Sequence, residues 1–316
     1  MIEVRELTKS YGPHRAVDSL TFTIKKGEVV GFLGPNGAGK TTTMKIVTGF
    51  MAPTSGTVAI GGHDIFEHPI EVKRRIGYLP EMPPVYGEMS VESYLRFVAR
   101  LKGVESQRVS TLVDRAIEKT NLGNERKRLI QNLSKGTRQR VGISQAIVSE
   151  PEVLILDEPT VGLDPRQVAE VRSLIRELAG QHTIVLSTHI LPEVQATCQR
   201  IIIINRGRIV AEDTLESLGK RLRGAIRIHL RVGKATPELE RAVSSVPGVK
   251  GLVARPQGVY EVDTDGSKEV AQAVASAVVT SGAGLVELRE ESFDLEEVFL
   301  KLTTSEDTQH TAGSLA

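Results

Sequence analysis

The stretch GFLGPNGAGKTT, residues 31–42, decides the fold of this 316-residue chain. It fits the pattern GxxxxGK[ST] through Gly34, Gly39, Lys40 and Thr41. An apolar segment typical of a buried strand (VVGFLG, 29–34) leads into it, and a helical segment (TTMKIVTGF, 42–50) follows it. This order of strand, glycine-rich loop and helix predicts a phosphate-binding loop in an α/β domain.

Each residue type in this loop has a chemical reason to be there. Glycines let the backbone N–H groups turn inward around phosphate oxygens, Lys40 can reach the β and γ phosphates, and the Thr41 hydroxyl can bind Mg²⁺. The alternative, a plain glycine-rich turn, would not explain the lysine. We therefore expect the whole loop to hold a nucleotide, through Gly34, Pro35, Asn36, Gly37, Ala38, Gly39, Lys40, Thr41 and Thr42.

A second chemical signal lies at the end of another apolar segment, VLILDEPT (153–160). Four apolar residues predict a buried strand, and Asp157 follows them at the carboxyl end, where α/β sheets bind their ligands. We expect Asp157 to bind Mg²⁺ and the adjacent Glu158 to be the base that orients an attacking water. The alternative is that the two acids only end the strand and cap the next helix.

Composition limits the other functions. The 40 basic and 39 acidic residues give a formal charge of +1, which predicts no nucleic-acid partner and no attraction to an anionic membrane. With Cys198 as its one cysteine, the chain excludes an internal disulfide and a cysteine-based metal cluster, and a buried apolar thiol is expected. No apolar run approaches the roughly 20 residues of a membrane-spanning helix. We expect a cytosolic chain whose membrane role, if any, comes from a partner.

Strand-like and helical segments alternate along the first two thirds of the chain, which predicts an α/β domain with a mostly parallel sheet. The expected strands are VVGFLG (29–34), TVAI (57–60), VLILDE (153–158), TIVLST (183–188) and RIIIIN (200–205). Residues 90–148 interrupt this alternation with amphipathic helical segments alone. They predict a helical lobe inserted in the α/β domain.

The composition changes after about residue 220, and the remaining segments follow the order strand, helix, strand, strand, helix, strand. This is the order of the ferredoxin-like split motif, a small α+β domain. The segment DLEEVFLKLT (294–303) predicts a last helix with Asp294 as its N-cap, and residues 304–316 are expected to be disordered. The predicted domains are therefore 1–218 and 224–303, and the second shows no catalytic constellation.

The stretch NLSKGTRQRV (132–141) places a serine, a glycine and basic residues at the start of an expected helix. Ser134, ahead of the apolar positions Val141 and Ile143, is typical of an N-cap. The N-terminus of a helix attracts anions, because its first N–H groups have no partner within the helix. Taken alone, the stretch is explained as well by a capped surface helix.

In their order along the chain, GPNGAGKTT, LSKGTRQR, LILDEPT, VGLDP and STH resemble the motifs of the nucleotide-binding domain of ABC transporters. The resemblance covers residues 1 to about 218. It implies a P-loop ABC-type domain that contains the helical lobe, binds ATP and Mg²⁺, and hydrolyses ATP. It also identifies LSKGTRQR as the signature motif of that family.

The resemblance implies roles for residues that would carry little weight alone. Tyr11 would stack on adenine and His189 would contact the γ-phosphate; without the motifs they would be an ordinary half-buried aromatic and a histidine at a strand end. Ser134 and Gly136 would touch the γ-phosphate of a nucleotide held by a second subunit, and Asp164 would lie at the dimer seam. These roles imply a homodimer with two nucleotides between its subunits.

The sequence departs from the family pattern at three positions. The signature is usually Leu-Ser-Gly-Gly-Gln, and here Lys135 and Thr137 replace its first glycine and its glutamine. In IGYLPE (76–81), Glu81 stands where the family offers a glutamine to the metal and to the membrane partner. We expect Glu81 to bind Mg²⁺ and to take part in hydrolysis, because a carboxylate is a stronger Mg²⁺ ligand than an amide.

These departures, and the last helical segment, are similar to the export-type branch, which includes gliding-motility and multidrug-efflux ATPases. The resemblance implies an ATPase subunit that powers a separate transmembrane permease, docked through the helical lobe at the cytoplasmic face of the membrane. The alternative is a soluble ABC ATPase acting on ribosomes or DNA. Such proteins carry two nucleotide-binding domains or a long coiled-coil insertion, and this chain has one phosphate loop and a short interval between Glu81 and Ser134.

Overall fold

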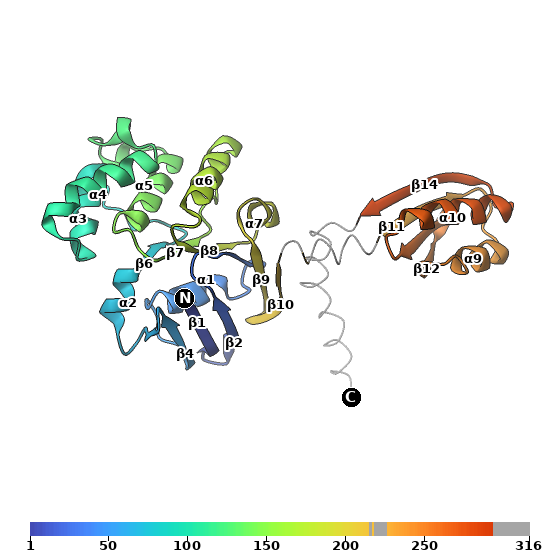
Figure 1. Cartoon of the computed structure of the whole chain (residues 1–316), viewed down its shortest axis with the longest axis horizontal. Coiled ribbons are helices and arrows are strands. Elements are labelled where there is room, and N and C mark those ends of the chain that lie inside the picture. Colours follow the sequence, from blue (N-terminus) through green and yellow to red (C-terminus); the bar gives the residue numbers. More distant parts are fainter. Residues whose placement is uncertain (215–216, 218–225, 293–316) are drawn as a thin grey trace. The chain divides into compact units, whose positions relative to one another are not determined.

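The computed structural model describes residues 1–214, 217 and 226–292. The chain divides into two compact units, Met1–Asp213 and Thr214–Ala316, and each is described by itself (Figure 1). The predicted last helix at 294–303 and the predicted disordered tail at 304–316 lie outside the described residues.

A six-stranded sheet forms the centre of the first unit, in the order β10-β9-β3-β8-β7-β6. Neighbouring strands from β9 to β6 pair in parallel, and every residue of β3, β7 and β8 is buried. The mostly parallel sheet expected from the apolar runs is therefore confirmed. Its strands are β3 Val29–Leu33, β6 Ile76–Leu79, β7 Val153–Asp157, β8 Thr183–Thr188, β9 Arg200–Asn205 and β10 Arg208–Thr214.

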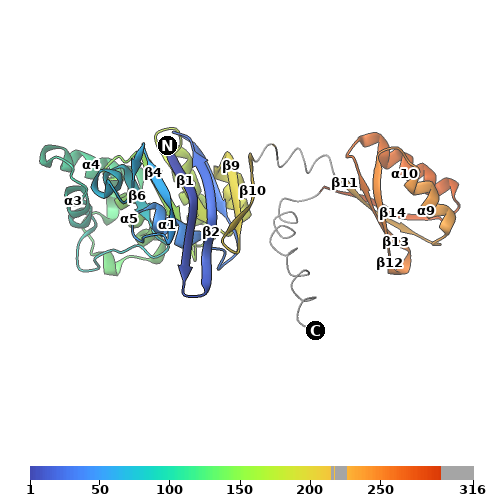
Figure 2. The same cartoon turned by 90° about the horizontal axis from the view of Figure 1, so that it is seen from below.

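A second, four-stranded sheet in the order β2-β1-β4-β5 was not expected from the sequence. The long strands β1 (Ile2–Tyr11) and β2 (His14–Ile24) lie side by side in it (Figure 2). The segment TVAI belongs here, in β4 (Ser55–Ile60), and not in the parallel sheet. The reason is the glycine turn at 61–62, which leads β4 directly into the antiparallel strand β5 (His63–Asp64) without a crossover helix.

Helix α1 (Lys40–Val47) follows the phosphate loop and joins the two sheets into one hydrophobic core. Its Met44, Ile46 and Val47 are buried in a cluster that also contains β1, β2 and β4 from one sheet and β3, β7 and β9 from the other. The remaining helices outside the lobe are α2 Pro69–Arg75, α6 Pro165–Leu178 and α7 Leu191–Thr197.

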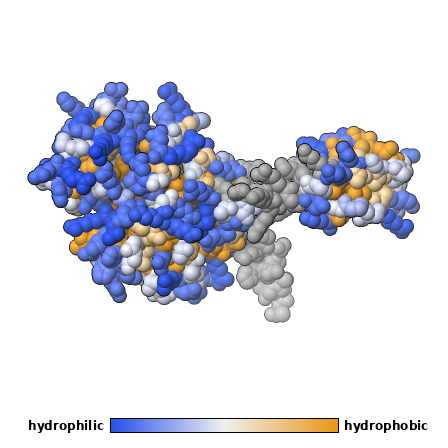
Figure 3. Space-filling model, in the orientation of Figure 1, coloured by the Kyte–Doolittle hydropathy of each residue, from blue (hydrophilic) through white to orange (hydrophobic). Residues whose placement is uncertain are grey.

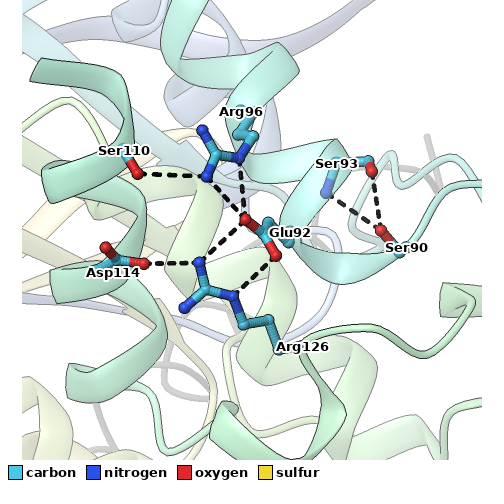
Figure 4. A network of polar contacts seen from close by, with 7 residues as sticks. All are labelled: Ser90, Glu92, Ser93, Arg96, Ser110, Asp114 and Arg126. Atoms are coloured by element: carbon cyan, nitrogen blue, oxygen red, sulfur yellow. Dashed lines mark hydrogen bonds and ion pairs between the residues drawn. The ribbon is translucent and has the colours of Figure 1, made fainter. Parts of the chain in front are cut away.

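The predicted helical lobe consists of α3 (Val91–Leu101), α4 (Ser106–Lys119) and α5 (Lys135–Ile147), and Figure 1 shows these helices grouped together. A polar network at the start of α3 connects the parts of the helical lobe (Figure 4). Glu92 accepts hydrogen bonds from Arg96 and Arg126, and Arg126 Nη2 lies 2.7 Å from Asp114 Oδ1 on α4. The arginines, Arg126 first, lower the pKa of Glu92 to about 2.

The second unit has the expected order of elements: β11 Ile226–Val232, α9 Pro237–Ser244, β12 Val249–Arg255, β13 Val259–Thr264, α10 Lys268–Thr280 and β14 Leu285–Ser292. Its antiparallel sheet has the order β12-β13-β11-β14. The two central strands are thus the first and third of the unit, and the expected ferredoxin-like α+β fold is confirmed. Thr236 caps α9, because its hydroxyl accepts a hydrogen bond from Leu239 N at 3.2 Å.

Hydrophilic residues cover most of the first unit in the face drawn in Figure 3, with separate apolar patches between them. Across residues 1–214 and 226–292, we find no helix with the length and apolarity needed to span a membrane. Cys198, at the end of α7, is buried as expected, and burial raises the pKa of its thiol to about 12.

Candidate functional site

A cavity of about 560 Å³ lies where the carboxyl ends of the parallel strands meet, next to the phosphate loop. Its size is that of a typical small-molecule site. The residues that line it come from the loop after β3 and the start of α1, from segments after β6, β7 and β8, and from the end of β1 and the start of β2. They are Tyr11, His14, Ala16, Asn36, Gly37, Gly39, Lys40, Thr41, Thr42, Glu81, Glu158, Val161 and His189.

The phosphate loop is held by close packing and by its own lysine. Gly39 has φ +104°, and a Cβ there would press on the carbonyl of Ala16. Lys40 is 5% exposed, and its Nζ donates to Gly34 O at 2.8 Å and to Pro35 O at 3.1 Å. These bonds aim the ammonium group at the interior of the loop, where the next opposite charge is Glu158, with Oε1 3.4 Å from Lys40 Nζ.

Glu158 lies between two basic groups. His189 Nδ1 is 3.0 Å from each of its carboxylate oxygens, and Lys40 Nζ is 3.4 Å from Oε1. The backbone of Glu158 has φ +48°, in the left-handed region that costs a non-glycine residue about 1–2 kcal/mol. Its N–H donates to Ser187 O at 2.8 Å, so the strained turn is tied to the end of β8.

Asp157 ends β7 and is fully buried. Ser187 Oγ donates to its Oδ1 at 2.7 Å, whereas its Oδ2 has no hydrogen-bond partner among the described residues. Burial raises the pKa of Asp157, the charges of Glu158 and Glu81 act in the same direction, and the hydroxyls of Ser187 and Thr41 oppose them. A buried carboxylate oxygen of this kind, beside the Thr41 hydroxyl, suits a divalent cation.

Tyr11 and Glu81 lie at the exposed side of the cavity. The Tyr11 ring is 46% exposed, its hydroxyl donates to Met51 Sδ at 3.0 Å, and Lys9 Nζ lies 5.5 Å from the ring centroid. Glu81 lies two residues after the end of β6, and its side chain is exposed. The structure therefore brings together the phosphate loop, Glu158, His189, Tyr11 and Glu81 around one cavity.

The signature segment is placed elsewhere. Ser134 caps α5, as predicted, by accepting a hydrogen bond from Thr137 N at 3.2 Å. Asp164 caps α6, because its Oδ1 accepts from Gln167 N at 2.9 Å. In the part of the chain that the structure describes, none of Ser134, Gly136 and Asp164 lines the cavity.

Two contacts join the start of α5 to its neighbours, one to the loop before α6 and one to α6 itself. A Cβ added to Gly136 would collide with the side-chain amide of Gln167, and one added to Gly162 would collide with the ammonium of Lys135. Both glycines therefore make room for a side chain from the other segment. Lys135, which replaces the first glycine of the usual signature, lies against the backbone at Gly162.

Gln139 and Ser187 support the site from within the LSKGTRQR and STH motifs, although the sequence alone indicates no role for either. Gln139, on the buried side of α5, donates from Nε2 to Pro159 O at 2.9 Å and so holds the turn after Glu158. Ser187 orients Asp157, and its place as the first residue of the STH motif is the signal that could have pointed to it. Ala38 is buried, and its N–H donates to Pro35 O at 3.2 Å inside the loop.

Comparison with known proteins gives consistent results. A family model for ABC transporters matches residues 17–161. A bacitracin transport ATP-binding protein of Bacillus licheniformis is 39% identical over 73% of this chain and 75% of its own length. A daunorubicin/doxorubicin resistance ATP-binding protein of Streptomyces peucetius is 34% identical over 96% of this chain and 92% of its own. A solved ATP-binding subunit of an ABC transporter covers 70% of this chain and 92% of its own, at 32% identity and a TM-score of 0.65.

Two of these three proteins are named for transport or as part of a transporter, and none of the three is named for action on ribosomes or DNA. The chain therefore belongs to the ABC transporter family, as one of its ATP-binding, ATP-hydrolysing subunits.

Proposed function

We propose that the cavity binds ATP together with Mg²⁺ and that Glu158 is the base that orients the attacking water. The observation that carries this proposal is the position of the Glu158 carboxylate, 3.4 Å from the phosphate-loop lysine and 3.0 Å from His189. A base for hydrolysis has to lie beside the γ-phosphate, and in this proposal Lys40 would bind that phosphate. His189 would also contact the γ-phosphate.

The proposal extends to the rest of the nucleotide. The triphosphate would lie over the backbone N–H groups of the loop from Gly34 to Thr42. The adenine would stack on Tyr11, whose exposed ring forms part of the cavity wall. Phosphate and Glu158 would compete for the ammonium of Lys40, so binding of ATP would free Glu158 to engage a water.

Three residues near the carboxyl ends of β6 and β7 and at the start of α1 suit a magnesium ion. The Oδ2 of Asp157, the Thr41 hydroxyl and the Glu81 carboxylate would supply oxygen ligands, and nucleotide phosphates would complete the set. Among the described residues no cluster of three or more His, Cys, Asp or Glu could hold a metal alone, which agrees with a cation shared with ATP. Once bound, the ion would neutralise charge on the β and γ phosphates.

We also propose that the site is completed by a second copy of the chain. The capped N-terminus of α5, with Ser134 and Gly136, has the N–H groups of an anion site but lies outside the cavity of its own chain. A head-to-tail homodimer would bring this end of α5 onto the γ-phosphate bound by the partner, with Asp164 at the seam. Lys135 would add positive charge near that phosphate.

Two inactive variants test this arrangement. Lys40→Ala removes the phosphate contact, and Ser134→Arg blocks the start of α5. If α5 acts on the partner's nucleotide, a purified heterodimer of the two has one site with both defects and one intact site, so single-turnover hydrolysis should reappear. If α5 acts within its own chain, every site keeps one defect. A heterodimer that forms with ATP but stays inactive would refute the composite site.

The helical lobe is the proposed docking surface for a transmembrane permease. On α3 of the lobe, Phe97 is 41% exposed, and its ring lies 5.7 Å from Tyr86. Tyr86 and Met82, on the segment just before the lobe, are 55% and 84% exposed. This exposed apolar and aromatic surface suits a helix presented by a membrane protein. The relatives are named for bacitracin transport and daunorubicin resistance, so we propose an exporter and a location at the cytoplasmic face of the membrane. Its cargo would be selected by the permease.

A further inference from the structure

A buried carboxylate behind the cavity connects the two segments that carry Glu158 and His189. Glu193 on α7 is 2% exposed. Its Oε2 accepts a hydrogen bond from Thr188 Oγ1 at 2.9 Å, and its Oε1 accepts a short one from Thr160 Oγ1. Thr160 is 4% exposed and Thr188 is fully buried, so water does not compete for either bond.

Both threonines are close in the chain to the residues proposed to act on ATP. Thr188 directly precedes His189, and its Oγ1 also accepts a hydrogen bond from Ile190 N at 3.1 Å. Thr160 lies two residues after Glu158, in the turn where Val161 N donates to Glu158 O at 3.3 Å. Each hydroxyl therefore links Glu193 to the backbone of one of the two segments.

The position of Glu193 is fixed by the packing of α7 on the sheet. A Cβ added to Gly31 in β3 would collide with Val194, so α7 packs directly on the backbone of that strand. Thr197 Oγ1 donates to Glu193 O at 2.7 Å and fixes the next turn of the helix. The carboxylate is thus attached to the centre of the sheet and not to a movable loop.

We propose that Glu193 is a positioning residue for hydrolysis, which sets the distance between Glu158 and His189 by bonding to both segments. The inference rests on the roles proposed above for these two residues. A carboxylate is suited to this task because it accepts from both hydroxyls at once, whereas an amide can accept only through its single oxygen. Misplacement of a reacting group by about 1 Å can cost a factor of about 100 in rate.

Threonine substitutions separate positioning from simple stability. Thr188→Val and Thr160→Val keep the shape and remove the hydroxyl, and they are expected to lower kcat about 10- to 100-fold with little change in the KM for ATP. Thr188→Ser and Thr160→Ser keep the hydroxyl and should restore most of the rate. Glu193→Gln should lower kcat as the valine variants do, and the threonine variants provide the test even if that protein folds poorly.

Thr183→Val is the matched control. Thr183 is also a buried threonine of β8, at the opposite end, where its Oγ1 accepts a hydrogen bond from Gly27 N at 3.0 Å. Its replacement should lower the thermal midpoint as much as Thr188→Val does, with kcat within a factor of two of wild type. If Thr188→Val also keeps wild-type kcat, the positioning role is refuted. If Glu158→Gln and His189→Ala keep it as well, the error lies in the proposed roles of those two residues.

Discussion

Lys40 Nζ and Glu158 Oε1 lie 3.4 Å apart with both side chains buried. Each group therefore neutralises the other at the point where the γ-phosphate is proposed to bind. Because opposite charges attract strongly where water is excluded, removal of the carboxylate should release the lysine for phosphate.

The first prediction is that Glu158→Gln nearly abolishes turnover while ATP binding is kept or becomes tighter. Loss of a general base costs a factor of about 100 to 10,000 in rate, and loss of the negative charge removes both repulsion of the γ-phosphate and competition for Lys40. Calorimetric titration with ATP and a steady-state phosphate assay measure the two effects.

Glu152→Gln provides the control for this experiment. Glu152 precedes β7 at its amino end, and its carboxylate pairs on the surface with Arg75 at 2.8 Å. The same chemical change at this end of the strand should leave both kcat and ATP affinity unaltered. A Glu158→Gln protein with kcat within a factor of two of wild type would remove Glu158 from the role of base.

A second prediction concerns Asp157, whose pKa is raised mainly by burial. Because the folded state then holds the proton more tightly than the unfolded chain, the ionised carboxylate destabilises the fold at pH 7 and protonation relieves this as pH falls. Asp157→Asn should therefore raise the thermal midpoint without metal. The same change should abolish the additional stabilisation of the fold that ATP gives when Mg²⁺ is present. For scale, a ligand at 100 times its Kd stabilises the folded state by about 2.7 kcal/mol.

Thermal unfolding with ATP and EDTA, compared with ATP and Mg²⁺, measures both the gain in stability without metal and the loss of the stabilisation by Mg²⁺. Asp64→Asn serves as the control, because its Oδ1 accepts from Phe66 N at 2.7 Å and asparagine keeps that acceptor. Equal stabilisation of the Asp157 variant by Mg²⁺ would show that the metal is held elsewhere.

Gly136 and Gln167 give a third prediction. Gly136→Ala should be tolerated in folding, because the atoms it would meet are at the free end of the Gln167 side chain. If α5 approaches a partner's phosphate, the added methyl should still lower hydrolysis. Gln167→Ala in the same chain distinguishes the causes: rescue of the rate means that the defect was the collision with Gln167, and no rescue means that the methyl obstructs the second subunit.

The fourth prediction uses the network of Glu92 in Figure 4. Because its folded pKa, about 2, is below the usual value of 4.5, its stabilising effect is complete above pH 4.5 and is lost as pH falls toward 2. Glu92→Gln should lower the free energy of unfolding by about 1 kcal/mol at pH 7. Urea unfolding at pH 7 and pH 3 should show the difference shrinking, whereas the exposed Glu118→Gln change should have little effect at either pH.

The fifth prediction is that removal of residues 224–316 leaves ATP binding intact. All the described residues that line the cavity belong to the first unit, which has its own core. ATP affinity by calorimetry should stay within a factor of about two, and we expect the small domain to brace or regulate the dimer, which sedimentation with ATP would reveal. Loss of binding by a folded truncated chain would contradict this division of roles.

Strands β3, β7, β8 and β9 are predictable because each contains a continuous apolar run that is buried. The sequence does not predict β6 and β10, because β6 has only four residues and β10 alternates with polar, partly exposed positions. β1 and β2 are harder to predict. Their pairing register shifts between Val4 and Leu7, and Glu6 and Ser19 have left-handed backbones, so the alternation of apolar and polar residues is broken. The sheet that β4 joins depends on tertiary pairing, which its short apolar run does not specify.

In the candidate site, the predictable residues are those that belong to local sequence motifs. Lys40, Asp157 and His189 each follow a buried strand, and parallel strands bring their carboxyl ends to one edge. Glu193 carries no such signal, since its bond to Thr160 spans 33 residues and depends on how closely α7 packs on Gly31. The distance from α5 to a partner's nucleotide likewise depends on how two chains pair, and this pairing cannot be predicted from the sequence of one chain.

The left-handed backbone at Glu158 has a consequence for how this protein can change. Glycine and asparagine fit φ +48° with less strain than glutamate. Glu158→Gly or Glu158→Asn would relieve this strain, but either change would also leave the buried Lys40 ammonium without its carboxylate partner. Relief of about 1–2 kcal/mol of strain is smaller than the cost of breaking a buried ion pair, about 3–5 kcal/mol. A laboratory evolution experiment that screens for heat resistance alone should therefore keep the glutamate, although no selection for ATPase activity is applied.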